Sequence, residues 1–291
     1  MNDGFYTALG TPLDPRGDLI EDSFRRQVSD QIAAGSAGLL ALGSMGHQPG
    51  IKTGECPKVA RACVEAAAGA CAVLVGVMDN SCHRVLSRID ALKHLKVDGV
   101  VATTPYYIPP RQEDLVSFYR TIADRSPLPL YLYDLPGITK TSIEIPTAEA
   151  LMGHPNIHGI KTGVLRTARS LLHSPAQNGS FHILFSELDL LDLGYAWGLR
   201  KCLDGIFSAL PEIARSFANA LRTEDMEALR KSQDTLSAVR DRLQGLGIFR
   251  AYSELMNLQG YEGNFAPDYA PPLSDKERNV VKSVADGAMP Q

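Results

Sequence analysis

Residues 157–163 read Ile-His-Gly-Ile-Lys-Thr-Gly, a short apolar run that ends in a lysine and opens into a glycine-containing turn. A run of this length, bounded by a turn, is typical of a strand buried on both faces. Lys161 would then stand where a buried strand meets a loop. An amine in that position loses hydration, which favours the neutral form that can attack a carbonyl carbon and form a Schiff base. Most lysines are solvated surface residues, so the rest of the chain has to decide between these interpretations.

Seven further runs of the same kind are spread along the chain, and amphipathic segments separate them. The apolar runs are residues 5–9, 38–42, 72–77, 99–102, 130–133, 182–185 and 205–207. The helical patterns include residues 22–34, 56–68, 82–95, 112–123, 147–152 and 211–221. Eight buried strands alternating with helices favour the α/β class, as a closed (β/α)8 TIM barrel. The alternative, a doubly wound open sheet, lacks support because no Gly-x-Gly-x-x-Gly motif follows the first run.

The chain continues beyond the last strand–helix unit. Residues 225–244 carry apolar side chains at helical spacing, and residues 248–258 and 275–285 show further helical patterns. A proline-containing break at residues 266–272 separates the last two. We expect a barrel over residues 1–224 and a C-terminal helical region over residues 225–291 that packs on the barrel.

The composition of the chain limits its expected binding partners and its expected cellular location. The 29 basic and 33 acidic residues give a net charge of −4 without a basic block, so nucleic acid is not an expected partner. The five cysteines show no Cys-x-x-Cys spacing, so neither a disulfide framework nor a zinc site is indicated. The first residues have no signal-peptide pattern, and no apolar run approaches the roughly 18 residues of a membrane helix. We expect a cytoplasmic protein with no membrane partner.

Polar residues follow several of the predicted strands. Active sites of TIM barrels lie at the C-terminal ends of the strands, so these residues would share one rim. Ser44 stands in the turn Gly43-Ser44-Met45-Gly46, Tyr107 ends the stretch at residues 103–107, and Tyr133 closes its own run. Each has an ordinary structural explanation, as a tight turn or a core aromatic. Together with Lys161 they form a candidate catalytic set.

Four motifs in this order give the chain a resemblance to a known family. They are Gly43-Ser44-Met45-Gly46, Thr104-Pro105-Tyr106-Tyr107, Tyr133-Asp134-Leu135-Pro136 and Gly159-Ile160-Lys161. The chain resembles the dihydrodipicolinate synthase/N-acetylneuraminate lyase family over essentially its whole length. The resemblance implies a TIM barrel and a class I aldolase that works through a lysine imine.

The resemblance implies catalytic roles for four residues. Lys161 matches the lysine that forms a Schiff base with the ketone of pyruvate or of another 2-oxo acid. Tyr133 matches the phenol that relays protons at the reacting atoms. Ser44 stands where a threonine or serine links that phenol to Tyr107, which in relatives reaches across a subunit interface. A homo-oligomer, either a tetramer or a dimer, is therefore expected.

The resemblance also implies how the substrate is held. The backbone amides of Ser44 and Met45 match those that bind the carboxylate of the 2-oxo acid, and Ile206 matches a residue that packs near it. The imine draws electrons from the adjacent carbon, so a carbon–carbon bond can form or break there. No metal and no separate cofactor is expected, because the covalent lysine imine takes that role.

Departures from the family pattern narrow the substrate. Family members that make dihydrodipicolinate have an arginine at the position of Ile138, where it pairs with the distal carboxylate of the aldehyde, and isoleucine cannot form that pair. Met45 replaces a frequent threonine, and His47 replaces a frequent glutamate. His47 is either a contact for a substrate hydroxyl or a structural loop histidine. Thr162 replaces another glutamate, and its hydroxyl would suit a polyhydroxylated substrate.

We therefore expect a carbon–carbon lyase or aldolase that acts on a 2-oxo-3-deoxy sugar acid or a related hydroxy-2-oxo acid. Its partners would be a 2-oxo acid such as pyruvate and an aldehyde. A 2-keto-3-deoxy acid dehydratase or a dihydrodipicolinate synthase on the same scaffold is the alternative enzyme. A barrel that only senses a 2-oxo acid is a further alternative, although a sensor has no need of a proton relay.

Overall fold

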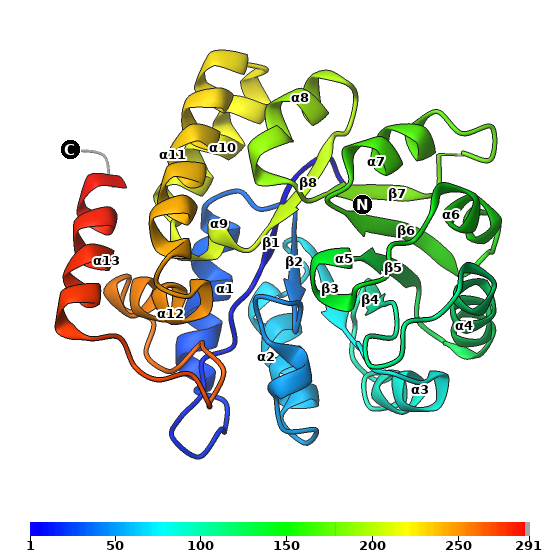
Figure 1. Cartoon of the computed structure of the whole chain (residues 1–291), viewed down its shortest axis with the longest axis horizontal. Coiled ribbons are helices and arrows are strands. Elements are labelled where there is room, and N and C mark those ends of the chain that lie inside the picture. Colours follow the sequence, from blue (N-terminus) through cyan, green and yellow to red (C-terminus); the bar gives the residue numbers. More distant parts are fainter. Residues whose placement is uncertain (178, 289–291) are drawn as a thin grey trace.

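Eight parallel strands close into a barrel in sequence order (Figure 1). The computed structural model describes residues 1–177 and 179–288. The strands are β1 (Gly4–Ala8), β2 (Gly38–Ala41), β3 (Ala72–Gly76), β4 (Gly99–Thr103), β5 (Leu130–Asp134), β6 (Ile157–Thr162), β7 (His182–Phe185) and β8 (Lys201–Asp204). The predicted TIM barrel is confirmed.

Helices connect the strands and cover the outside of the barrel. They are α1 (Glu21–Ala33), η1 (Gln48–Gly50), α2 (Cys56–Ala67), α3 (Cys82–Asp90), α4 (Gln112–Arg125), α5 (Pro136–Thr139), α6 (Ile145–Met152), α7 (Leu165–Leu172), η2 (Leu188–Leu190), α8 (Leu191–Ala196), α9 (Ile206–Ala209) and α10 (Pro211–Thr223). The helical segments expected from the sequence correspond to α1, α2, α3, α4, α6 and α10, with ends that differ by a few residues.

The eighth strand is not where the sequence pattern put it. We expected residues 205–207, but β8 is Lys201–Asp204 and the short helix α9 begins at Ile206. Lys201 and Asp204 are polar, so the strand does not stand out as an apolar run. Its register is nevertheless complete, because β8 pairs with β1 from Gly4↔Lys201 to Thr7↔Asp204. The sequence therefore predicted an eighth strand correctly but placed it at the wrong residues.

Alternate residues of each strand point into the barrel or toward the helices. The interior is filled by a compact cluster of Tyr6, Ala8, Leu40, Leu74, Val101, Tyr131, Tyr133, Leu184 and Leu203. A much larger apolar cluster fills the space between the outer face of the barrel and the helices. Because Tyr131 and Tyr133 both point inward, the phenol at the end of β5 belongs to the upper layer of the barrel interior.

Three helices follow the barrel, namely α11 (Met226–Gln244), α12 (Ile248–Leu258) and α13 (Asp275–Ala288). The Asp225 side chain caps α11 by accepting hydrogen bonds from the backbone N–H groups of Glu227 and Ala228. α11 packs against α10 and α8, and α12 packs against α9. Figure 1 shows α13, in red, at the edge of the molecule beside α11 and α12. The division of the chain at residue 224 stays a prediction.

Within the described ranges, no helix has both the length and the apolar character needed to cross a bilayer. All five cysteines are free thiols.

His182 begins β7 at the N-terminal end of the barrel and is partly buried. Burial lowers the pKa of His182 from 6.5 to about 4, and the positive charges of the N-terminal amine and Lys201 act in the same direction. Between pH 4 and 6.5 the folded protein therefore keeps this imidazole neutral, whereas the unfolded chain binds a proton. This group thus reduces the stability of the fold as the pH falls from about 6.5 to about 4, and it has no further effect below that.

We predict that His182→Gln weakens the pH dependence of stability in this window. The free energy of unfolding, measured in urea at pH 7 and at pH 5, should fall less on acidification in the variant than in the wild type. Both proteins should begin at Met1 without a tag, because the charge of that amine contributes to the shift. An equal fall in both proteins would mean that His182 titrates alike in the folded and unfolded states.

Candidate active site

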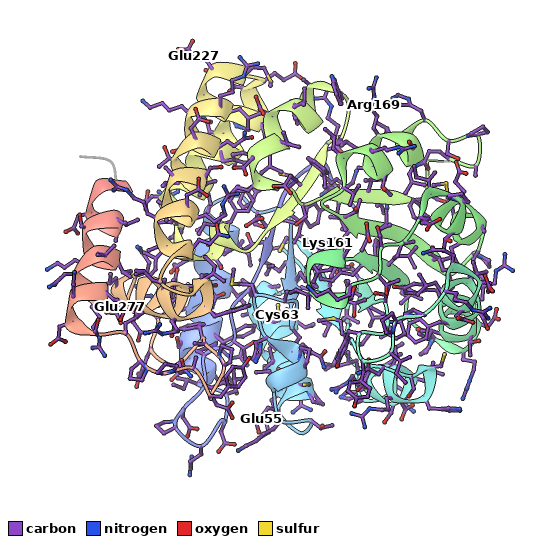
Figure 2. All side chains as sticks on the ribbon, viewed as in Figure 1. Glu55, Cys63, Lys161, Arg169, Glu227 and Glu277 are labelled. Carbon is purple, nitrogen blue, oxygen red and sulfur yellow. The ribbon has the colours of Figure 1, made fainter. Side chains whose placement is uncertain are left out.

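Lys161 lies inside the barrel with its amine in contact with two hydroxyl groups. The residue is 5% exposed and comes next to last in β6. Its Nζ donates hydrogen bonds to the Tyr133 hydroxyl at 3.0 Å and to Ser186 Oγ at 2.7 Å. It also lies 4.2 Å from the centre of the Tyr133 ring. Figure 2 shows Lys161 near the middle of the molecule, among the strands.

The contact between Lys161 and Tyr133 follows from strand register. The two residues are direct partners across β5 and β6, so their side chains emerge on the same face of the sheet. The Tyr133 hydroxyl is in turn 3.2 Å from Ser44 Oγ. A continuous chain of polar contacts therefore runs from Ser44 through Tyr133 and Lys161 to Ser186. It joins the turn after β2 to the ends of β5, β6 and β7.

The turn after β2 depends on an unusual backbone conformation. Leu42 has a φ of 57°, a left-handed value that is strained for a residue with a side chain. The turn brings the Leu42 carbonyl over Gly76, where a Cβ would come within 1.9 Å of that oxygen. Only glycine fits at position 76. The N–H groups of Ser44 and Met45 meet no acceptor among the described residues, so the turn offers two donors to a carboxylate.

Met45 and Ile206 meet near the end of β8. The Met45 side chain lies against Gly205, where an added Cβ would come within 2.7 Å of its Cε. Ile206 is buried, and its N–H donates to Asp204 Oδ1 at 2.8 Å. Burial raises the pKa of the Asp204 carboxyl, although the Ile206 amide and the charge of Lys161 act against this. Met45 and the end of β8 thus close the side of the barrel mouth next to the turn.

Tyr107 and Ile138 lie at the outer rim and are exposed to solvent. Tyr107 is 83% exposed, and its backbone N–H donates to Asn80 Oδ1 at 2.8 Å. Within one described chain its phenol does not join the contacts around Ser44 and Tyr133. Ile138 is 58% exposed on α5. The structure therefore leaves the predicted roles of these two residues untested.

His47 and Thr162 are not brought to the lysine. His47 has a φ of 50° and packs against Phe249, with ring centres 5.8 Å apart. Burial lowers the pKa of His47. Thr162 is fully buried, and its hydroxyl donates to Asp134 Oδ2 at 2.8 Å. In this structure His47 is a loop residue that contacts the C-terminal helix α12, and Thr162 ties the ends of β6 and β5 together.

Ser186 is the residue that the sequence analysis missed. It immediately follows β7, on the same rim as Lys161, and supplies the shorter of the two hydrogen bonds to the amine. The sequence signal that could have identified Ser186 is its position directly after the apolar run at residues 182–185. A serine after a strand is common in turns, so that signal alone does not separate a catalytic contact from a structural one.

Three comparisons with known proteins agree on one family. Residues 1–287 match the model of the dihydrodipicolinate synthetase family. A 4-hydroxy-tetrahydrodipicolinate synthase of Gluconobacter oxydans (strain 621H) is 30% identical over 241 residues, which are 83% of this chain and 81% of the relative. The family model thus covers nearly the whole chain, and this relative covers most of it.

Solved structures give the same answer for the fold. The dihydrodipicolinate synthase from Thermotoga maritima has a TM-score of 0.90 at 24% identity, covering 99% of both chains. YagE, a prophage protein of the same family from Escherichia coli K12 in complex with pyruvate, has a TM-score of 0.88 at 21% identity, again covering 99% of both chains.

The barrel and its family matches place the protein among the class I, pyruvate-dependent aldolases, which are carbon–carbon lyases. More narrowly, the chain belongs to the dihydrodipicolinate synthetase family. The resemblance inferred from the four sequence motifs is confirmed.

We predict that Lys161 is the residue that forms the covalent link. Pyruvate with borohydride should leave a reduced pyruvyl group on Lys161, because this amine is buried and held in place by two hydroxyls. Peptide mass spectrometry locates the adduct. Lys161→Ala should abolish the labelling, whereas Lys140→Ala, which removes an exposed lysine, should retain it. An adduct on another lysine would contradict the assignment.

A second prediction concerns the Tyr133 hydroxyl. Tyr133→Phe keeps the buried ring but removes the group that contacts both Lys161 and Ser44. Turnover should fall roughly 100-fold or more, the scale of a lost acid–base group. Steady-state rates are compared with circular dichroism and the melting temperature, which report whether the variant is folded. A folded variant with nearly normal turnover would make Tyr133 a core aromatic only.

Proposed function

We propose that the enzyme cleaves or forms a carbon–carbon bond in a 2-oxo-3-deoxy sugar acid or a related hydroxy-2-oxo acid, with pyruvate as product or donor. The observation that carries the proposal is the buried Lys161 amine between the Tyr133 and Ser186 hydroxyls. The pyruvate complex of the related YagE protein supports pyruvate as the ligand of this amine.

The first half of the reaction forms the imine. The amine of Lys161, after losing a proton, adds to the ketone carbon, and the carbonyl π electrons move to the oxygen. That oxygen is protonated through the Tyr133 hydroxyl and leaves as water. The resulting iminium carbon is bound to nitrogen, and the N–H groups of Ser44 and Met45 hold the neighbouring carboxylate. One water is released for each imine formed.

The second half breaks the bond between C3 and C4 of the substrate. Tyr133 takes the proton of the C4 hydroxyl, with Ser44 as its hydrogen-bond partner. The C3–C4 electron pair becomes the double bond of an enamine, the iminium nitrogen accepts the displaced π pair, and an aldehyde leaves. Protonation of C3 and addition of water then release pyruvate and restore the amine. The reverse sequence condenses pyruvate with an aldehyde.

The preference for a hydroxylated aldehyde rests on α5. Position 138 carries an exposed isoleucine, which cannot bind a distal carboxylate through a forked hydrogen bond. The nearby Lys140 ammonium is directed to the Gly137 carbonyl at 2.7 Å, and Lys140 has a φ of 62°. This cation is therefore engaged within its own loop.

Two other activities on the same scaffold have support. The relative from Gluconobacter oxydans carries the name of a 4-hydroxy-tetrahydrodipicolinate synthase, which favours that synthesis as the second candidate. A dehydratase would use the same imine and enamine to expel a β-hydroxyl in place of an aldehyde. Pyruvate release distinguishes these reactions, because a dehydratase leaves the carbon chain of its substrate whole.

We also propose a cytoplasmic homo-oligomer, a tetramer or a dimer, that needs no further cofactor. The exposed side chains of Tyr107, Ile108 and Ile138 support an interface near the barrel mouth. In such an interface Tyr107 would extend toward the site of a second copy, as the family resemblance implies.

We predict that the enzyme condenses pyruvate with glyceraldehyde and that it condenses pyruvate with aspartate semialdehyde poorly or not at all. A distal carboxylate beside Ile138 lacks a charge-assisted hydrogen bond, which is worth about 1.5–3 kcal/mol. The catalytic efficiency with aspartate semialdehyde should therefore be at least about 10-fold lower. Pyruvate consumption in the presence of each aldehyde is the measurement. Efficient condensation with aspartate semialdehyde would assign the chain to the synthases and leave the lysine chemistry intact.

A further inference from the structure

Thr103 is the last residue of β4 and points into the barrel beside the catalytic tyrosine. It is the register partner of Tyr133, so the two side chains emerge on the same face of the parallel pair. Val101, two residues earlier, belongs to the interior cluster together with Tyr133. Thr103 is 4% exposed. Its hydroxyl therefore lies in the upper layer of the barrel interior, next to the Tyr133 ring and one strand further from Lys161.

The Thr103 hydroxyl is buried and has no hydrogen-bond partner among the described residues. Two other threonines near these strand ends, Thr104 directly after β4 and Thr162 at the end of β6, are paired. Thr104 donates to the Thr141 carbonyl at 3.4 Å, and Thr162 donates to Asp134 at 2.8 Å. The unpaired hydroxyl is thus a feature of the barrel interior, where the lysine chemistry takes place.

An unpaired buried hydroxyl lowers the stability of the free protein. Leaving such a group without a partner costs about 1–3 kcal/mol, whereas valine has nearly the same shape and carries no such cost. Below this layer the interior is filled by apolar side chains, among them Val101, Leu74 and Leu40. A hydroxyl in this layer is therefore explained by a partner that the free protein does not contain.

Imine formation gives a substrate access to this layer. In the free enzyme the Lys161 amine lies over the Tyr133 ring and bonds to two hydroxyls. An ammonium has three N–H donors, but an iminium nitrogen has one, so the two hydrogen bonds cannot both persist. If the lysine side chain leaves the face of the ring, the substrate bound to its nitrogen would lie beside Tyr133 and Thr103.

We infer that the Thr103 hydroxyl binds an oxygen of the aldehyde-derived part of the substrate, which makes Thr103 a specificity-determining residue. This inference rests on the proposed function. A threonine hydroxyl both donates and accepts, so it can pair with a substrate hydroxyl in either direction. A substrate that lacks this hydroxyl would leave Thr103 unpaired, so the site favours hydroxylated aldehydes over apolar ones of similar size.

The test compares two aldehydes and two variants of the full chain. Pyruvate is condensed with glyceraldehyde or with propanal, which lacks its hydroxyl groups, and the ratio of the two catalytic efficiencies is measured. The wild type should prefer glyceraldehyde. Thr103→Val should lower this preference about 10-fold, the effect of one lost hydrogen bond, while Thr103→Ser should restore most of it.

Stability gives an independent readout, with Thr162→Val as the matched control. Thr103→Val should melt at the wild-type temperature or up to roughly 3 °C higher, because no bond of the free protein is lost. Thr162→Val should melt lower, because it breaks the bond to Asp134. A Thr103→Val protein destabilised like Thr162→Val would show that the hydroxyl has a structural partner, and the inference would be overturned.

The remaining outcomes separate this inference from the proposed function. If the wild type condenses both aldehydes equally well, Thr103 does not select a hydroxyl, although the aldolase assignment stands. If Thr103→Val lowers both efficiencies by the same factor, its effect is on packing, which also overturns the inference. If pyruvate labels Lys161 but neither aldehyde condenses, the proposed function fails and the role of Thr103 fails with it.

Discussion

A buried amine is stable inside an apolar barrel only if hydrogen bonds replace the water that it loses. The Tyr133 and Ser186 hydroxyls supply those bonds to Lys161. Leaving a buried polar group without a partner costs about 1–3 kcal/mol, so these two contacts offset much of the cost of removing the amine from water. In the proposed mechanism the Tyr133 hydroxyl is also the group that moves protons. The contacts that make the buried lysine tolerable therefore also hold it next to the hydroxyl that would relay protons in the proposed mechanism.

Strand register is what brings these groups together, and register is poorly visible in a sequence. The alternation of apolar runs with helical patterns was enough to predict the barrel, because strands covered on both faces are apolar along their whole length. β8 was misplaced because Lys201 and Asp204 bound it, whereas the more apolar stretch after Gly205 begins the helix α9. Only Cys202 and Leu203, between the two polar ends of β8, are apolar. A search for apolar runs passes over such a strand.

The candidate site was predictable to the extent that it lies at the strand ends. Lys161, Tyr133 and Ser44 follow that rule, and the structure connects them through hydrogen bonds. The direction of Thr162 could have been predicted from the sequence. Adjacent strand residues point to opposite faces, so Thr162 points outward if Lys161 points into the barrel. His47 could not be placed in this way, because its direction depends on the left-handed turn in which it lies. The Ser186 contact required the register of β6 and β7.

The residues proposed for the lysine chemistry are buried, whereas Ile138, one of the residues proposed to select the aldehyde, is exposed. Lys161 and Tyr133 are buried, so a substitution at either leaves a polar neighbour unpaired and costs stability as well as activity. Ile138 is exposed on a loop helix, where a substitution usually changes stability by less than about 0.5 kcal/mol. Rim residues can therefore change without disturbing the barrel or the imine. For that reason a match over the whole chain identifies the reaction type, while the aldehyde depends on the few side chains that contact it.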